Sequence, residues 1–216
     1  METIENERAI EMVRTQIESR GIRDPRVIQV MSALPRHLFV PEGLRHCAYE
    51  DHPLSIGEGQ TISQPYIVAL MTEALAVGEQ DTVLEIGTGS GYQAAVLSRI
   101  VKQVFTIEVR ELHFRRARRL FQALSFDNVH CRYGDGYWGW SQHAPYDAIM
   151  VTAAVDHVPA PLFRQLKEGG RLIVPLGNPP CHQRLALVTK CERKFRVRYI
   201  TGVMFVPMTG KALRRS

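Results

Sequence analysis

A short hydrophobic stretch that runs straight into alternating glycines constrains this chain more than any other feature. Residues 82–86 read as a buried strand, and Gly87, Gly89 and Gly91 follow before a helical pattern begins at Tyr92. Glycine tolerates positive φ and lets backbone N–H groups approach a ligand where a Cβ would collide. Open parallel sheets bind nucleotide-like ligands at this place, beyond the carboxyl end of a strand. The segment therefore predicts a Rossmann-like α/β domain with a ligand at this turn.

The spacing of the glycines separates two classes of ligand. Dinucleotide sites usually carry G-x-G-x-x-G, whereas the pattern here is G-x-G-x-G, with Tyr92 at the place of the third glycine. Glu85, two residues before Gly87, would repel a pyrophosphate but suits a ligand with a cationic amino-acid portion. S-adenosylmethionine is such a ligand, because it carries an ammonium and a sulfonium and no phosphate. The turn therefore favours S-adenosylmethionine over NAD.

Acidic residues follow the next two expected strands. Glu108 lies 17 residues past Gly91, at the end of a strand, where a carboxylate can accept both hydroxyls of a ribose. Asp135 and Gly136 follow a third strand and can supply another ligand contact, although an Asp-Gly pair is also an ordinary turn. Acids at three successive strand ends are a stronger signal than any one of them.

From residue 81 onward, strands alternate with helices, which predicts a doubly wound, mostly parallel sheet flanked by helices. The expected strands are 82–86, 104–107, 129–133, 146–152 and 171–175. The expected helices run from the turn to residue 100, over 112–124 and over 162–166. Two β-rich stretches without an intervening helix, 184–190 and 195–205, predict antiparallel C-terminal strands at the end of the sheet.

The first 80 residues read as an N-terminal helical extension. Apolar residues at helical spacing predict a first helix that stops at Gly21 (Ile10, Val13 and Ile17). Asp24-Pro25 is a capping pair for a second helix through Ala33, and a further helix is expected from about Ser63 to Ala76. We expect residues 1–80 to carry the active-site loop and residues 81–216 to form the cofactor-binding core, within one compact domain overall.

Composition argues against several function classes. The formal charge of +5 is far below the charge density of a dedicated nucleic-acid binder. The longest apolar run, around residues 148–155, is too short to span a bilayer, and the N-terminus lacks an apolar signal core. The four cysteines form no C-x-x-C pair, so we expect reduced thiols, no metal site and a cytoplasmic protein. Phosphate-loop, H-E-x-x-H and G-x-S-x-G motifs are missing, and the arginines of residues 115–119 read as a solvated helix face.

Further segments make the pattern more specific. They are RHLFVP at 36–41, GQTISQP at 59–65, GDG at 134–136, PYDAI at 145–149, GGRL at 169–172 and FVPMT at 205–209. With the glycine turn, these segments resemble the protein-L-isoaspartate O-methyltransferases, over nearly the whole chain from about residue 12 to residue 209. The turn alone indicates only the wider methyltransferase class, whereas the element at 60–65 distinguishes this family.

The resemblance implies a role for residues at matching positions. Ser63 corresponds to the active-site serine, and Thr209 belongs to a C-terminal segment that folds back over the site. The implied contacts of S-adenosylmethionine are Glu85, Gly87 and Gly89 at its methionine end, Glu108 at the ribose, and Asp135 with Gly136 at the adenine, together with Thr61, Ile62, Thr88 and Gly91. The implied substrates are damaged proteins and peptides, which are methylated on the free α-carboxylate of an L-isoaspartyl residue. The ester then collapses to a succinimide that can reopen as aspartate.

This chemistry suits a site without a general base. An α-carboxyl group has a pKa of roughly 3.5, so the nucleophile is already ionised at neutral pH and the protein must mainly supply alignment. Ser63 and Pro65 predict a helix N-cap whose hydroxyl and helix dipole can hold the acceptor carboxylate, with a plain capping serine as the alternative. Three other functions stay open: a related methyltransferase acting on RNA or a small molecule, a non-catalytic cofactor-binding protein, and a nicotinamide dehydrogenase. We expect neither a nucleic-acid nor a membrane partner.

Overall fold

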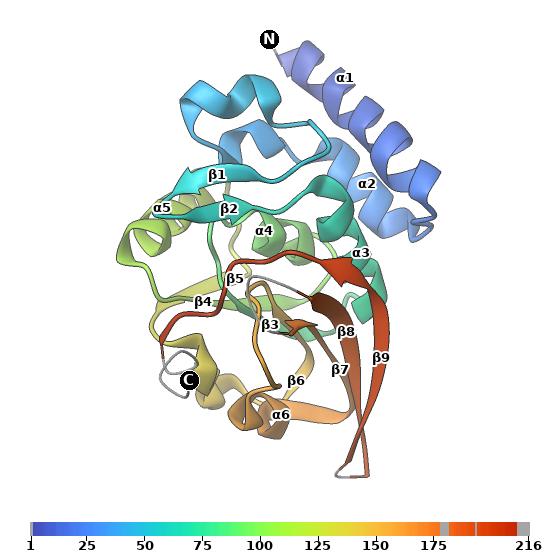
Figure 1. Cartoon of the computed structure of the whole chain (residues 1–216). Coiled ribbons are helices and arrows are strands. Elements are labelled where there is room, and N and C mark those ends of the chain that lie inside the picture. Colours follow the sequence, from blue (N-terminus) through green and yellow to red (C-terminus); the bar gives the residue numbers. More distant parts are fainter. Residues whose placement is uncertain (1, 178–181, 193, 211–216) are drawn as a thin grey trace.

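A computed structural model describes residues 2–177, 182–192 and 194–210 of the chain. Within these residues, seven strands form one sheet in the order β5-β4-β3-β6-β7-β8-β9 (Figure 1). The first five strands in this order run parallel, and β8 and β9 are antiparallel to their neighbours. The strands are β3 (Thr82–Ile86), β4 (Gln103–Glu108), β5 (Val129–Tyr133), β6 (Tyr146–Val151), β7 (Leu166–Leu176), β8 (Gln183–Cys191) and β9 (Lys194–Val203). The predicted doubly wound sheet with antiparallel C-terminal strands is confirmed.

The strand order creates a topological switch point between β3 and β6. The chain winds outward from β3 to β4 and β5, then returns to place β6 on the other side of β3. Ligands of open α/β sheets bind in the crevice that such a reversal opens at the carboxyl ends of the strands. The glycine turn directly follows β3, and Thr152 directly follows β6. The fold therefore places the predicted ligand turn in this crevice.

Helices cover the sheet as the alternating pattern predicted. Helices α4 (Tyr92–Ser98) and α5 (Glu111–Ala123) pack on β4 and β5, whereas α3 (Pro65–Leu75) and α6 (Ala160–Gln165) pack on β7. The short 3₁₀ helices η5 (Gly136–Trp138) and η6 (Ser141–His143) connect β5 to β6. None of the described helices combines the length and the apolar composition needed to cross a bilayer.

The N-terminal segment is helical, with one departure from the expected face. Helix α1 (Glu2–Met12) continues through the π-helix η1 (Val13–Ile17) and the 3₁₀ helix η2 (Glu18–Arg20), and it ends at Gly21 with φ of 95°. Val13 and Ile17 are buried, but Ile10 is 51% exposed, because Ala9 and Met12 take the inward positions instead. Helix α2 (Pro25–Ala33) begins as predicted, with the Asp24 carboxylate accepting from the Arg26 N–H at 2.9 Å.

Three elements differ from the sequence prediction. Helix α3 begins at Pro65 with Gln64 as its N-cap, so the prediction of Ser63 as the cap was wrong. An antiparallel hairpin, β1 (Leu54–Gly57) and β2 (Gln60–Ile62), was not predicted and follows the 3₁₀ helices η3 (Arg36–Phe39) and η4 (Glu42–Cys47). Strand β7 begins at Leu166 rather than at residue 171, because Leu166 already pairs with Tyr146 and the glycines at 169 and 170 lie within an irregular part of the ladder.

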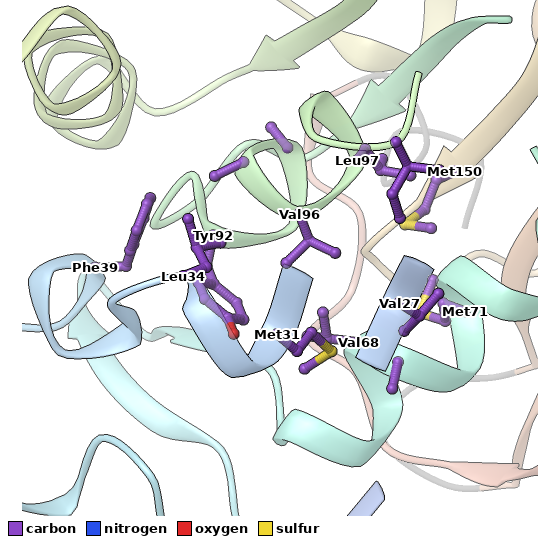
Figure 2. Packing of buried hydrophobic residues seen from close by; sticks show 14 of the residues in the cluster. Val27, Met31, Leu34, Phe39, Val68, Met71, Tyr92, Val96, Leu97 and Met150 are labelled. Carbon is purple, nitrogen blue, oxygen red and sulfur yellow. The ribbon is translucent and has the colours of Figure 1, made fainter. Parts of the chain in front are cut away.

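The N-terminal helices and the sheet domain share one hydrophobic cluster. Figure 2 shows Val27 and Met31 of α2 beside Val68 and Met71 of α3, with Tyr92, Val96 and Leu97 of α4 facing them. Buried residues from both sides of residue 81 therefore stabilise each other, which fixes the Ser63 region relative to the glycine turn. The functional division into an extension and a cofactor core stays a prediction.

Helix α4 depends on close packing at Gly91, where φ is 86° and an added Cβ would lie 2.8 Å from Phe121 Cζ of α5. We expect Gly91→Ala to lower the free energy of unfolding by roughly 2–4 kcal/mol, because it combines a left-handed backbone with overpacking. Gly21→Ala meets only the backbone penalty, and Gly43→Ala meets neither. In urea denaturation, Gly91→Ala should lose the most unfolding free energy, Gly21→Ala less and Gly43→Ala the least. Equal losses in the three variants would contradict the packing role of Gly91.

Candidate functional site

The glycine turn is held against the end of β6. Gly87 has φ of 98°, and its N–H donates to the Ile107 carbonyl at 2.9 Å. The Thr152 hydroxyl lies 2.9 Å from the Ile86 carbonyl and 2.7 Å from the Gly87 carbonyl, so these two acceptors share its one proton. The Thr152 N–H also donates to the Ile86 carbonyl at 2.9 Å. A Cβ at Gly87 would collide with Thr152 Oγ1, so only glycine fits here without a shift. The turn therefore presents bare backbone at the switch point of the sheet.

Glu108 joins the turn to the end of β4. Its Oε2 accepts from the Gly89 N–H and its Oε1 from the Arg110 N–H, each at 2.8 Å. The side chain is almost fully buried, yet it lines the cavity beside the turn. Each carboxylate oxygen has a second lone-pair direction for a ligand hydroxyl. Glu108 thus lies where the sequence analysis expects a ribose to bind.

Glu85 lies beneath the turn rather than in the cavity wall. It is fully buried, its Oε2 accepts from the Thr106 hydroxyl at 2.5 Å, and its Oε1 has no hydrogen-bond partner. Thr106 Oγ1 is in turn 2.6 Å from Thr88 Oγ1, within the turn itself. Burial raises the pKa of Glu85 to about 8, and the nearby Glu108 charge adds to this rise while the Thr106 hydrogen bond opposes it. Burial therefore favours the protonated form of this carboxyl at neutral pH.

Two small cavities adjoin at the turn, and most of the predicted site residues line one or both of them. The first, of about 70 Å³, is lined by Thr61, Gly87, Gly89, Glu108, Gly136, Thr152 and Thr209, among others. The second, of about 40 Å³, is lined by Thr61, Ile62, Ser63, Gly87, Thr88, Gly89, Tyr92 and Thr152, among others. Glu85, Gly91 and Asp135 do not line either cavity.

The C-terminal segment forms one of these walls. Figure 1 shows the segment after β9 running back across β3 toward β4. The Ala154 N–H donates to the Val206 carbonyl at 2.9 Å, and the Met208 N–H donates to the Ala154 carbonyl at 2.8 Å. Asp135 caps η5 by accepting from the Tyr137 N–H, and a Cβ at Gly210 would lie 2.7 Å from its carboxylate. Residues 206–210 therefore fold over the turn as a strap.

A third, larger cavity reaches Ser63 from the other side. It encloses about 530 Å³ and is lined by Ser63, Gln64, Thr152, His182 and residues 202–206, among others. Thr61 and Thr152 line all three cavities, so they stand where the small cavities adjoin the large one. Sequence reasoning missed Thr152, although its place after β6, at the switch point, was a signal that could have found it. Ser63 makes no side-chain hydrogen bond within the described residues, so its hydroxyl is available to a ligand.

These residues fit a cationic nucleoside derivative. The glycines leave room for close approach, Glu108 offers acceptors for ribose hydroxyls, and the unpartnered Oε1 of Glu85 leaves an acidic group beneath the turn. Within the described part of the chain, no group of three or more His, Cys, Asp or Glu side chains is arranged to hold a metal. Cys47, Cys131 and Cys191 are free thiols, and Cys181 lies outside the described residues.

Comparison with known proteins gives one consistent family. The family model described as protein-L-isoaspartate(D-aspartate) O-methyltransferase matches residues 7–213. The protein-L-isoaspartate O-methyltransferase 2 of Shewanella sediminis is 60% identical over 205 residues, which cover 95% of this chain and 84% of that protein. The protein-L-isoaspartate O-methyltransferase of a Picosynechococcus strain is 51% identical over 199 residues, covering 92% and 89% of the two chains.

Solved structures agree with these sequence relatives. A protein-L-isoaspartate O-methyltransferase matches with a TM-score of 0.85 and 32% identity, covering 96% of this chain and 67% of the other. A Plasmodium falciparum structure described as the same kind of enzyme, in complex with S-adenosyl-L-homocysteine, matches with a TM-score of 0.80 over 93% of this chain and 98% of the other. At 23% identity, this second likeness supports the fold alone.

The buried Glu85 carboxyl should make stability depend on pH. Its pKa is about 8 in the folded chain and near the ordinary value of 4.5 when unfolded, so the folded state binds more protons between these values. Its contribution to stability is therefore fully present below about pH 4.5 and is lost as pH rises toward 8, by up to about 1.4 kcal/mol per pH unit. In urea denaturation at a series of pH values, we expect the free energy of unfolding of wild type to fall relative to that of Glu85→Gln as the pH rises from about 4.5 to 8. Glu111→Gln, which removes an exposed carboxyl, controls for charge, and parallel wild-type and Glu85→Gln curves would contradict the assignment.

Proposed function

The chain belongs to the protein-L-isoaspartate O-methyltransferase family, and from that premise we propose how its own residues carry out the family's reaction. The enzyme transfers a methyl group from S-adenosylmethionine to the α-carboxylate of L-isoaspartyl residues. The predictions of family, enzyme class and cofactor are thereby confirmed. The identities of 51–60% over nearly the whole chain favour this substrate over RNA or a small molecule, and they favour catalysis over binding alone.

The arrangement of the cavities is the observation that supports the proposed positions of the methyl donor and the acceptor. The small cavities contact the glycine turn, the large one opens beside residues 202–206, and Thr61, Thr152 and Ser63 stand where they adjoin. We assign the methyl donor to the turn and the acceptor peptide to the large cavity. The two reactants then approach from opposite sides of Ser63, which suits an in-line transfer.

Each predicted cofactor residue receives a role under this proposal. Gly87, Gly89 and Gly91 shape the turn, Thr88 connects it through Thr106 to the buried Glu85, and Glu108 accepts hydrogen bonds from the ribose hydroxyls. Thr61 and Ile62 border the reacting end. Asp135 and Gly136 border the adenine end, and Thr209 covers the cofactor as part of the strap. A cation bound at the turn favours the ionised form of Glu85, so cofactor binding should release a proton from it.

The residues of this chain supply alignment and exclude water. When bound, S-adenosylmethionine supplies an electrophilic methyl group on a positively charged sulfur. The Ser63 hydroxyl donates a hydrogen bond to the acceptor carboxylate and holds one oxygen toward the turn, while the hairpin and the strap keep water out. No base is needed, because the acceptor is already ionised at neutral pH. A low dielectric strengthens the attraction between the reactants, and good alignment is worth roughly 7–11 kcal/mol.

The substrate in the cell is a damaged protein or peptide, and we place the enzyme in the cytoplasm, where its free thiols stay reduced. The acceptor must be flexible or partly unfolded to bring a carboxylate into the large cavity. Methylation converts that carboxylate into an ester, whose methoxy group leaves more readily than the oxygen of a carboxylate. The neighbouring amide can then displace methanol and close the succinimide.

Methyl transfer to matched peptides tests the proposed function. We expect the protein to transfer radiolabelled methyl from S-adenosylmethionine to a peptide with one L-isoaspartyl residue, as a base-labile ester. The same peptide with normal aspartate should gain roughly a hundredfold less label, because its side-chain carboxylate is displaced from the reacting position. Equal labelling of both peptides, or labelling of RNA instead, would contradict the assignment.

A further inference from the structure

Arg36 is a fully buried arginine that lines none of the three cavities of the candidate site. It begins η3, its Nε donates to the Ala48 carbonyl and its Nη2 donates to the Ser63 carbonyl, each at 2.7 Å. Its guanidinium carbon lies 4.8 Å from the centroid of the Tyr92 ring, at the start of α4. One side chain thus connects the segment before the hairpin, the Ser63 segment and the helix that follows the glycine turn.

The charge of Arg36 has no acidic partner within the described residues. The buried Tyr92 hydroxyl is its other polar neighbour, and this interaction raises the pKa of Arg36, although by less than burial lowers it. Burial lowers the pKa of Arg36 to about 10, so the side chain stays protonated at neutral pH. A buried cation without a counter-ion is costly, and a purely structural link between two carbonyls could be made by a neutral side chain. The arrangement therefore calls for a role beyond packing.

The contact with Ser63 supplies that role. Ser63 precedes the N-cap of α3, and within the described residues its hydroxyl forms no hydrogen bond that would fix it. Its side-chain position therefore depends on the backbone that carries it, and Arg36 holds that backbone from the buried side. The planar guanidinium can reach two carbonyls at once, which a lysine ammonium on a flexible stem cannot do with the same geometry.

We propose that Arg36 is a positioning residue for methyl transfer, which acts by fixing the Ser63 backbone so that the Ser63 hydroxyl meets the acceptor carboxylate. The inference rests on the proposed role of Ser63. A displacement of about 1 Å can cost a hundredfold in rate, so loss of this anchor should lower kcat much more than cofactor affinity.

A double-mutant cycle tests the proposal with isoaspartyl peptide as substrate. We expect Ser63→Ala to lower kcat roughly a hundredfold and Arg36→Met roughly thirtyfold, with dissociation constants for S-adenosylhomocysteine within about threefold of wild type. The double variant should be no more than about threefold slower than Ser63→Ala, because Arg36 then has no hydroxyl to position. If Arg36→Met does not fold, Arg36→Lys replaces it in the same cycle, since it keeps the cation near Tyr92.

Arg171→Met is the matched structural control. Arg171 Nη1 donates to the Leu75 carbonyl at 3.0 Å, at the other end of α3, and Arg171 lines none of the three cavities. The Arg171→Met variant should have a lower melting temperature, while its kcat stays within about twofold of wild type. The proposal would be overturned if the kcat of the double variant fell by the product of the two single losses. It would also be overturned if the Arg36 variant, like Arg171→Met, lowered the melting temperature while kcat stayed near the wild-type value. Wild-type turnover in Ser63→Ala would also overturn it, while leaving the methyl-transfer activity of the enzyme itself established.

Discussion

The close contact between Gly87 and Thr152 is the constraint on which the rest of the site depends. The Thr152 hydroxyl hydrogen-bonds with the carbonyls of Ile86 and Gly87, where β3 ends, and it occupies the space that a Cβ at residue 87 would need. This contact closes β3 against β6 at the switch point and directs the turn toward Glu108. The same threonine borders the cavity at the turn and the larger cavity beside residues 202–206, so one packing contact shapes the turn and also lies where the two cavities adjoin.

Sequence could predict the parts of the fold that local pattern determines. Strands β3 and β5 have the predicted bounds. Strand β3 is a short, mostly apolar run that ends at a glycine, whereas in β5 apolar and polar residues alternate up to Gly134. The alternation of strands and helices is enough to require a parallel, doubly wound sheet. Spacing predicted that Glu108 lies near the glycine turn, since the carboxyl ends of parallel strands share one edge, and Gly87, Gly89 and Glu108 line one cavity.

Other features depend on contacts between residues far apart in the chain. Pro65 is the first residue of α3, so the cap falls on Gln64, and Ser63 is left free to face the cavities. The β1–β2 hairpin is too short to show a clear period, and among the described strands β1 and β2 pair only with each other. Arg36 looks like a surface residue in sequence, and nothing local shows that Ala48, Ser63 and Tyr92 enclose it. Family resemblance pointed to the segment but not to these contacts.

Calorimetric titration of S-adenosylhomocysteine into Gly87→Ala, beside wild type and Gly43→Ala, tests the central claim most directly. The account predicts that Gly87→Ala weakens binding by roughly tenfold or more, because the new methyl group must displace Thr152 and strains a residue with φ of 98°. Gly43→Ala, in open space, should bind like wild type. An unchanged dissociation constant for a folded Gly87→Ala protein would show that the turn is not the cradle of the methyl donor.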